Sequence, residues 1–271
     1  MDARPIGIFD SGYGGLTAVR ALRALCPEEN LVFFADSGRA PYGGRSVPQL
    51  RTMARQDLAF VASFGAKAII AACGTVSSNF PELLKSFPVP AIGVLEASVA
   101  EIRTERETGP IGVIATEATV RSGSFERALR EACPGREVIS RACPAFVPLI
   151  EAGRCGAEDR ELREAAEAYL KPLKERGVRT LLLACTHYGL IAPLLDGILE
   201  GRARLVEASV CAARQMNELL GQRKLRGGEG RLRCLTSGPV ERFERLAPLF
   251  LQQAEAPETL SAPLMPTEES L

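Results

Sequence analysis

Short apolar runs that alternate with stretches of helical period constrain the fold of this 271-residue chain more than any other feature. The runs that read as strands are Ile6 to Phe9, Leu31 to Ala35, Ala68 to Ala72, Ala91 to Val94, Ile111 to Ala115, Val138 to Ser140, Thr180 to Ala184, Arg204 to Val206 and Leu232 to Leu235. The helical stretches between them include Leu16 to Leu25, Val47 to Phe64, Ser122 to Ala132 and Glu158 to Arg176. Strands that alternate with helices form parallel sheets covered by helices, so the pattern predicts an α/β fold.

The two halves of the chain resemble each other. IGIF at residues 6–9 is similar to IGVI at 111–114, and AIIAAC at 68–73 is similar to TLLLAC at 180–185. We therefore expect two similar doubly wound parallel-sheet domains related by pseudo-symmetry, with an active site in the cleft between them. Chance similarity between generic apolar strands is the alternative.

The same reading predicts where the domains begin and end. Residues 1–96 and 209–255 are expected to form the first domain, and residues 97–208 the second. Gly221 to Gly230 reads as an exposed loop. Residues 256–271 are rich in Pro, Glu and Ser and are expected to be a flexible tail.

Charge and hydropathy exclude several classes of protein. The chain has 33 Lys plus Arg and 33 Asp plus Glu, so its formal net charge is zero. Binding to nucleic acid or to an anionic membrane depends on a basic excess, and we expect neither as a partner. No apolar run approaches the roughly 20 residues of a membrane-spanning helix. The N-terminus lacks the basic and apolar regions of a secretion signal, which predicts a cytoplasmic protein.

The cysteines are too few for a disulfide scaffold and are expected to be free thiols. No two of the eight form a CxxC pair, and His187 is the only histidine, so we expect no metal site. Cys73 and Cys185 follow equivalent strands in the two halves. The others are expected to be structural or surface thiols: Cys26, Cys133, Cys143, Cys155, Cys211 and Cys234.

Four polar segments follow predicted strands, and ligands of parallel sheets bind at that edge. They are DSGYGG at 10–15, APYGG at 40–44, ACGTVSSN at 72–79 and ACTHYG at 184–189. Glycine-rich turns between a strand and a helix offer free backbone N–H groups to a carboxylate or a phosphate. The first segment lacks the lysine and the spacing of a nucleotide-binding loop, and by itself it also fits a tight turn in which Asp10 caps a helix.

Two opposed thiols suit a reaction that removes a proton from one face of a carbon and returns another to the opposite face. An ordinary thiol has a pKa of about 8.5, and lowering it to about 7 takes about 2 kcal/mol of preferential stabilisation of the thiolate. Helix N-termini and a neighbouring imidazole can supply a shift of this size. Asp10 could orient a thiol or accept its proton, although its charge would raise the thiol pKa.

At these segments the chain resembles the glutamate racemases of the aspartate/glutamate racemase family. IGIFDSGYGGLTAVRAL is similar to the family opening IGxFDSGxGGLTVxxxL, APYG to VPYG, and ACTHY at 184–188 to GCTHY. The resemblance runs from about residue 5 to residue 250 with the motifs in order. It implies racemisation of L-glutamate to D-glutamate for peptidoglycan synthesis without a cofactor. It also implies that the protein is a homodimer and that its ligand is a small-molecule substrate, glutamate.

The resemblance also implies roles for single residues. Cys73 would be the thiol that acts on D-glutamate and Cys185 the one that acts on L-glutamate. Asp10 would assist Cys73, while His187 and Glu151 would assist Cys185. The residues implied in holding the substrate are Asp10, Ser11, Pro41, Tyr42, Gly43, Gly74, Thr75, Thr119, Thr186 and His187.

One position departs from the family pattern. Gly74 stands where the family has asparagine, so an amide that helps to hold the amino-acid end of the substrate is missing. The loss of one hydrogen bond to a charged group costs about 1.5 to 3 kcal/mol. A racemase of a related acidic amino acid such as aspartate, or a catalytically impaired binding homologue, is therefore an alternative.

A hydrolase that uses Cys185 as nucleophile and His187 as base is another alternative. The two residues lie at i and i+2, and in an extended segment such side chains point the same way. This alternative leaves Cys73 without a role.

Overall fold

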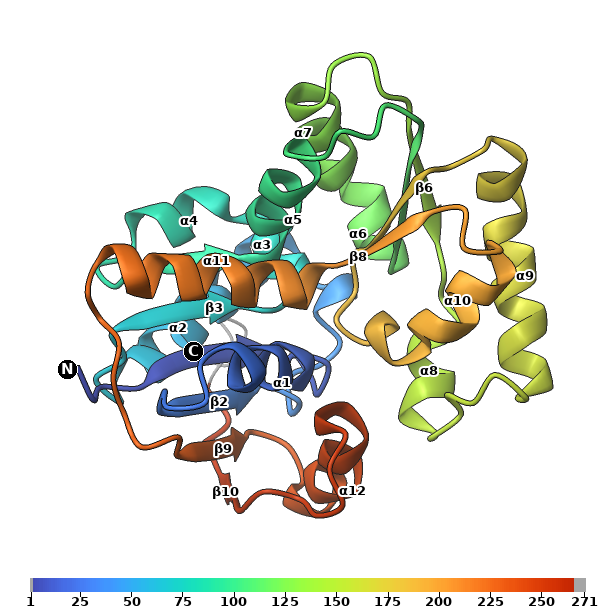
Figure 1. Cartoon of the computed structure of the whole chain (residues 1–271). Helices are drawn as coiled ribbons and strands as arrows, with labels where there is room; N and C mark the ends of the chain where they lie inside the picture. Colours follow the sequence, from blue (N-terminus) through green and yellow to red (C-terminus); the bar gives the residue numbers. More distant parts are fainter. Residues whose placement is uncertain (1, 266–271) are drawn as a thin grey trace.

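The computed structural model describes residues 2–265, whose strands form two sheets (Figure 1). The first sheet contains β1 (Ile6–Asp10), β2 (Leu31–Ala35), β3 (Ala68–Ala71), β4 (Ala91–Gly93), β9 (Leu232–Thr236) and β10 (Thr259–Ser261). The second contains β5 (Ile111–Ala115), β6 (Val138–Ala142), β7 (Thr180–Leu183) and β8 (Arg204–Glu207). Every strand pair is parallel, which confirms the predicted fold class.

The two sheets repeat one strand order. The first runs β10-β9-β2-β1-β3-β4 and the second β6-β5-β7-β8, so β2-β1-β3-β4 corresponds to β6-β5-β7-β8. The registers agree as well, because Ile6 of β1 aligns with Ala68 of β3 and Ile111 of β5 aligns with Thr180 of β7. The similar sequences of the two halves therefore belong to equivalent strands and are not chance matches.

Helices cover the sheets. In chain order they are α1 (Leu16–Leu25), α2 (Val47–Ala62), α3 (Gly74–Asn79), α4 (Pro81–Ser86), α5 (Val94–Arg103), α6 (Glu117–Ser122), α7 (Ser124–Ala132), α8 (Phe146–Glu151), α9 (Arg160–Glu175), α10 (Ala192–Ile198), α11 (Ala208–Gln222) and α12 (Val240–Leu251). Two short 3₁₀ turns, Tyr42–Gly44 and Tyr188–Ile191, lie in predicted site segments.

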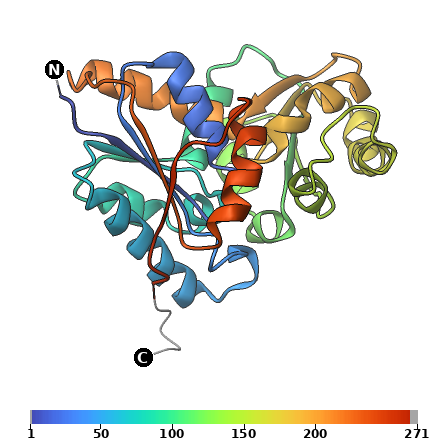
Figure 2. The ribbon, with the colours of Figure 1, turned by 90° about the horizontal axis from the view of Figure 1, so that it is seen from below.

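The first sheet is buried on both faces. Alternate residues of a strand point to opposite faces, and Ile8 and Phe33 belong to the apolar cluster that contains α1 and α11. Phe9 and Phe34 belong to the cluster that contains α2. Figure 2 shows the strands between these two helical layers. Burial on both sides explains why these runs are continuously apolar.

The chain passes between the sheets twice. It leaves the first sheet after β4 through α5, and it returns from β8 into α11. These two crossing helices pack against each other, and one apolar cluster runs from the first domain into the second. This distribution of strands fits domain boundaries near residues 96 and 208, which stay a prediction.

The predicted tail is wrong in its first part. Residues 259–261 form β10, which pairs with β9 at the sheet edge, and Ala262 is 6% exposed and donates its N–H to the carbonyl of Thr236. The Pro- and Glu-rich composition gave no sign of a strand here. The three residues pair with the edge strand β9, whose backbone N–H and C=O groups would otherwise lack partners on that side. Residues 266–271 of the predicted tail lie outside the described part of the chain.

The predicted loop at 221–230 is also only partly exposed. Gly227 is buried, because its N–H bonds to Glu29 and its carbonyl accepts a hydrogen bond from Lys67. Between residues 2 and 265, no helix combines the length and the apolar character needed to cross a bilayer.

Candidate active site

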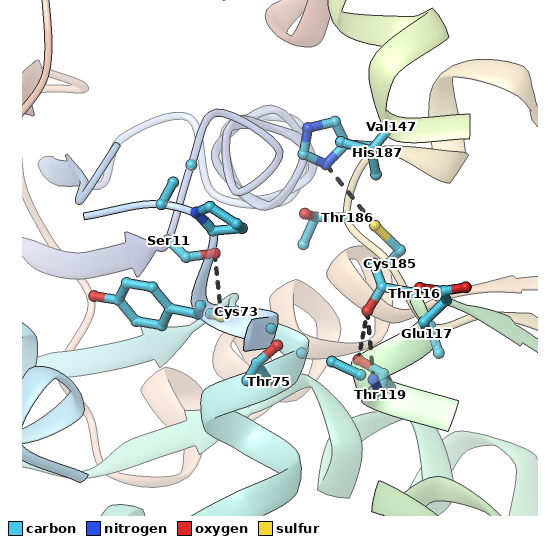
Figure 3. A pocket seen from close by; sticks show the side chains of 18 of the residues that line it. Ser11, Cys73, Thr75, Thr116, Glu117, Thr119, Val147, Cys185, Thr186 and His187 are labelled. Carbon is cyan, nitrogen blue, oxygen red and sulfur yellow. Dashed lines mark hydrogen bonds between the residues drawn. The ribbon is translucent and has the colours of Figure 1, made fainter. Parts of the chain in front are cut away.

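A cavity of about 590 Å³ brings all of the sequence-predicted site residues together. It opens between the two domains at the carboxyl ends of β1, β3, β5 and β7. Its lining contains Asp10, Ser11, Pro41, Tyr42, Gly43, Cys73, Gly74, Thr75, Thr119, Glu151, Cys185, Thr186 and His187. Figure 3 shows Cys73 and Cys185 on opposite sides of the pocket, with Thr186 between them in this view. The two thiols thus share one cavity.

The first thiol is held by the turn after β1. Cys73 follows β3 and caps α3, and its thiol donates to Ser11 Oγ at 3.4 Å. Ser11 in turn donates its backbone N–H to Asp10 Oδ1 at 2.8 Å. Burial and the charge of Asp10 raise the pKa of Cys73 to about 12. Cys73 is therefore a protonated thiol in the free site.

The sequence suggested that a helix N-terminus can lower the pKa of a thiol, but the net shift at Cys73 is upward. The N–H of Val76 in α3 does favour the Cys73 thiolate, but Cys73 is only 3% exposed, and burial outweighs one backbone dipole.

The orientation and the pKa of the Asp10 carboxyl depend on residues of the second domain. Asp10 is 3% exposed, and its Oδ2 accepts a hydrogen bond of 3.1 Å from Thr186 Oγ1. Burial raises the pKa of Asp10, while the charge of His187 and hydrogen bonds from Thr186 and Ser11 act in the opposite direction. A carboxylate with a raised pKa beside a thiol is suited to take up the thiol proton. The N-cap of α1 is Gly15 and not Asp10, and a hydrogen bond from the backbone of Gly15 also favours the charged form of the Asp10 carboxyl.

The second thiol is paired with the histidine. Cys185 Sγ lies 3.9 Å from His187 Nδ1, and His187 Nε2 lies 3.1 Å from Glu151 Oε1. Burial disfavours the charged imidazole, but hydrogen bonds to Cys185 and Glu151 outweigh it and raise the pKa of His187 to about 10. His187 is thus an imidazolium at neutral pH, held between a thiol and a carboxylate.

The contact between Cys185 and His187 has a different local origin from the one predicted. The backbone of His187 is helical, with φ −72° and ψ −30°, and residues 186–187 form a turn. An extended segment is therefore not what brings the two side chains together.

The turn after β1 approaches the second domain closely at Gly14. A Cβ at this position would lie 2.1 Å from Thr186 Oγ1 and 2.5 Å from His187 Nδ1. Only a residue without a side chain fits there. Gly74 faces the same boundary, because a Cβ would lie 3.1 Å from the carbonyl oxygen of Ala184 and 3.9 Å from Thr119 Oγ1.

Tyr42 lines the cavity with its hydroxyl already bound elsewhere. The hydroxyl lies between the carboxyl groups of Asp36 and Asp57, 2.6 Å from Asp57 Oδ2. Arg39 bonds to both carboxyl groups, at 2.6 and 2.9 Å. Burial and the charge of Asp36 raise the pKa of Asp57 well above its usual range. This buried cluster anchors the 40–44 loop and leaves Tyr42 its ring and backbone for the cavity.

Besides Thr119 and Glu151, seven lining residues lie outside the four segments predicted from the sequence, and all of them belong to the second domain: Thr116, Glu117, Ala118, Arg121, Cys143, Pro144 and Val147. Thr116 caps α6 through the N–H of Thr119, a signal readable from a threonine after an apolar strand. Cys143 was expected to be structural; it is fully buried, and burial raises its pKa to about 12. Among residues 2–265, no three His, Cys, Asp or Glu side chains are grouped to hold a metal ion.

Two similar parallel-sheet domains that each present a thiol to one cavity define the class of two-domain α/β racemases. The sequence pattern of the Asp/Glu/Hydantoin racemases matches residues 17–216. The chain belongs to this family.

Known relatives agree over almost the whole chain. The glutamate racemase of Desulforudis audaxviator is 36% identical over 264 residues, which cover 94% of this chain and 96% of the relative. The structure of glutamate racemase from Francisella tularensis in complex with D-glutamate has a TM-score of 0.88 and 31% identity, and covers 97% of this chain and 99% of its own. The Thermus thermophilus enzyme, in complex with β-chloro-D-alanine, has a TM-score of 0.85 and 34% identity, with the same coverage of both chains.

Proposed function

We propose that this protein racemises glutamate by proton transfer between Cα of the substrate and two thiols, Cys73 and Cys185. The observation that carries the proposal is that both thiols line a single cavity. Cys73 follows β3 of the first domain, and Cys185 follows β7, the equivalent strand of the second domain. Relatives named glutamate racemase, one of them with D-glutamate bound, support glutamate as the substrate.

The two sides of the site differ in the free protein. The His187 imidazolium beside Cys185 stabilises negative charge on that sulfur, while Cys73 carries its proton. This state suits L-glutamate: Cys185 takes the Cα proton as the Cα–H bond breaks, and Cys73 delivers its own proton to the opposite face. D-glutamate requires the reverse state, in which Cys73 is the thiolate. Asp10 can accept the Cys73 proton in that direction.

Hydroxyl and backbone groups around the cavity supply the remaining contacts. Ser11, Thr75, Thr119 and Thr186 lie on its wall and are suited to bind the carboxylates and the amino group. These residues come from both domains, so a bound substrate would contact both halves of the chain. Pro41, Tyr42 and Gly43 contribute their backbone to the same wall.

Gly74 is the position that bears on substrate choice. A Cβ here would lie 3.1 Å from the carbonyl oxygen of Ala184 and 3.9 Å from Thr119 Oγ1, and glycine provides no amide to bond to the substrate. Aspartate racemisation and an impaired homologue are the alternatives that the missing amide leaves open. The line from Cys185 through His187 to Glu151 also resembles a hydrolase triad, but that reaction gives no role to Cys73.

The product, D-glutamate, would be used for peptidoglycan synthesis. We propose that the enzyme acts in the cytoplasm, as a homodimer, and without a cofactor.

Circular dichroism on each enantiomer of glutamate and aspartate, with protein freed of added cofactor, tests the proposal. The circular dichroism signal should decay from either enantiomer of glutamate. In deuterated solvent, deuterium should be incorporated at Cα during turnover. Cys73→Ala and Cys185→Ala should each lose racemisation. Full activity in either variant would falsify the two-thiol mechanism.

A further inference from the structure

Helix α12 reaches from the first domain to the two residues that accompany Cys185. It follows β9, a strand of the first sheet, whereas Glu151 ends α8 and His187 follows β7 in the second domain. Figures 1 and 2 show α12 beside the boundary between the domains. The helix is therefore placed to act on the second half of the site from outside it.

Arg242 clamps the Glu151 carboxylate. Its Nη2 donates to Glu151 Oε2 at 2.8 Å, while the other oxygen, Oε1, lies 3.1 Å from His187 Nε2. The guanidinium also lies over the ring of Tyr13, with 5.6 Å between its carbon and the ring centroid. Each carboxylate oxygen thus has its own partner, and the orientation of Glu151 is set from both sides.

The other end of α12 touches the imidazole itself. The ring of Phe250 meets His187 edge to face, with centroids 5.0 Å apart and planes at 87°. Phe250 is fully buried, and His187 is 7% exposed. The helix therefore restrains His187 by a packing contact and, through Arg242 and Glu151, by a polar one.

The polar contact contributes little to folding. Arg242 is 51% exposed and Glu151 20%, and ion pairs in such positions stabilise a fold only weakly. Burial raises the pKa of Glu151, but His187 and Arg242 outweigh it and hold this pKa below its usual value. Glu151 therefore remains a carboxylate, and its orientation is the property that Arg242 changes.

We propose that Arg242 is a positioning residue for the Cys185 half of the site: by holding the Glu151 carboxylate, it keeps His187 aligned with the Cys185 sulfur. The kinetic part of this proposal rests on the proposed function. Neither Cys73 nor Asp10 bonds to α12 in residues 2–265, so the Cys73 half is an internal control.

Alkylation by iodoacetamide, followed for each cysteine by peptide mass spectrometry, tests the alignment without turnover. In Arg242→Gln, labelling of Cys185 should slow by about three- to tenfold, because the imidazolium no longer lies steadily beside the sulfur. Labelling of Cys73 should stay within about twofold. Arg242→Lys, which keeps a cation near Glu151, should restore most of the rate.

A matched control excludes a general effect of charge on the helix. Arg245 lies exposed on the same helix, and Arg245→Gln should leave both labelling rates unchanged. Unaltered Cys185 labelling in Arg242→Gln, equal slowing at both cysteines, or the same result in Arg245→Gln overturns the proposal.

Isotope effects extend the test to turnover. Cys185 is the thiol assigned to L-glutamate, so the primary isotope effect from 2-deuterated L-glutamate should grow in Arg242→Gln, and that from 2-deuterated D-glutamate should not. Equal changes for both enantiomers count against the proposal. A wild-type protein that does not racemise glutamate refutes the proposed function instead, and alkylation still decides the role of Arg242.

Discussion

Thr186 donates a hydrogen bond to Asp10 across the boundary between the two domains, with 3.1 Å between Oγ1 and Oδ2. Asp10 ends β1 of the first sheet, and Thr186 follows β7 of the second. The carboxylate proposed to serve Cys73 is therefore tuned by a side chain from the half that carries Cys185. A change in how the two domains pack would therefore alter the surroundings of both thiols.

Replacement of Thr186 by valine should weaken the Cys73 half of the reaction. The variant keeps the shape but loses the hydrogen bond that opposes the rise in the Asp10 pKa. This pKa should therefore rise further, so that Asp10 is protonated in a larger fraction of molecules, in which it cannot accept the Cys73 proton. A hydrogen bond to a charged group is worth about 1.5 to 3 kcal/mol, or about ten- to hundredfold in kcat/KM. Thr186→Ser keeps the hydroxyl and is the control. Equal rates in the two variants would contradict the role of this bond.

Gly14→Ala should abolish most activity without touching the thiols directly. The added Cβ needs the space of Thr186 Oγ1 and His187 Nδ1, which lie 2.1 and 2.5 Å from it. Displacement of such groups by about 1 Å costs about 10²-fold in rate. Gly197→Ala is the matched control, because a Cβ there meets nothing within 4 Å. Racemisation assays with thermal unfolding measure both variants, and wild-type activity in Gly14→Ala rules out the close approach.

Gly74→Asn should strengthen glutamate binding. An amide at this position can bond to the amino-acid end of the substrate, and we expect KM to fall about tenfold. The Cβ lies 3.1 Å from the carbonyl of Ala184, so the boundary must give by a few tenths of an ångström. Gly74→Ala adds the same Cβ without the amide and should not improve KM. If the alanine variant binds as well as the asparagine one, the amide is not the missing group.

His187 should stay protonated far above the range of an ordinary histidine. It is the only histidine in the chain, so its imidazole signals can be followed by NMR without assignment. With a pKa of about 10, these signals should not titrate between about pH 6 and 8. In Glu151→Gln the pKa should fall, because a hydrogen bond and a negative charge are lost. Glu244→Gln, on the exposed side of α12, is the control; a midpoint near 6.5 in the wild type refutes the assignment.

The same pKa predicts how stability changes with pH. The folded-state pKa of His187 is higher than the unfolded one, so protonation of His187 stabilises the fold. The contribution is complete below about pH 6.5 and is lost as the pH rises through about 10. Denaturant unfolding at pH 7 and pH 10 should show a smaller loss of stability in Glu151→Gln than in the wild type. An equal loss in the two proteins contradicts this linkage.

Local sequence was enough to predict most of the fold. Runs such as Leu31–Ala35 and Ile111–Ala115 form strands with the predicted bounds. A short run of β-forming residues that is apolar on both faces is typical of a parallel strand buried from both sides. The strand β10 was missed because its composition is that of a linker and its partner, β9, lies more than twenty residues earlier. A short edge strand is held by backbone hydrogen bonds to its neighbour, and these bonds require no particular pattern of side chains.

The sequence by itself determined which residues stand at the carboxyl ends of the strands, and hence that Cys73 and Cys185 occupy equivalent positions. The side-chain period of strands and the parallel order of α/β sheets are local rules, so a single chain suffices to apply them. Only the tertiary structure decided what surrounds each thiol. The bond from Thr186 to Asp10 and the one from Arg242 to Glu151 depend on how two separately formed sheets sit against each other, and no local pattern encodes that placement.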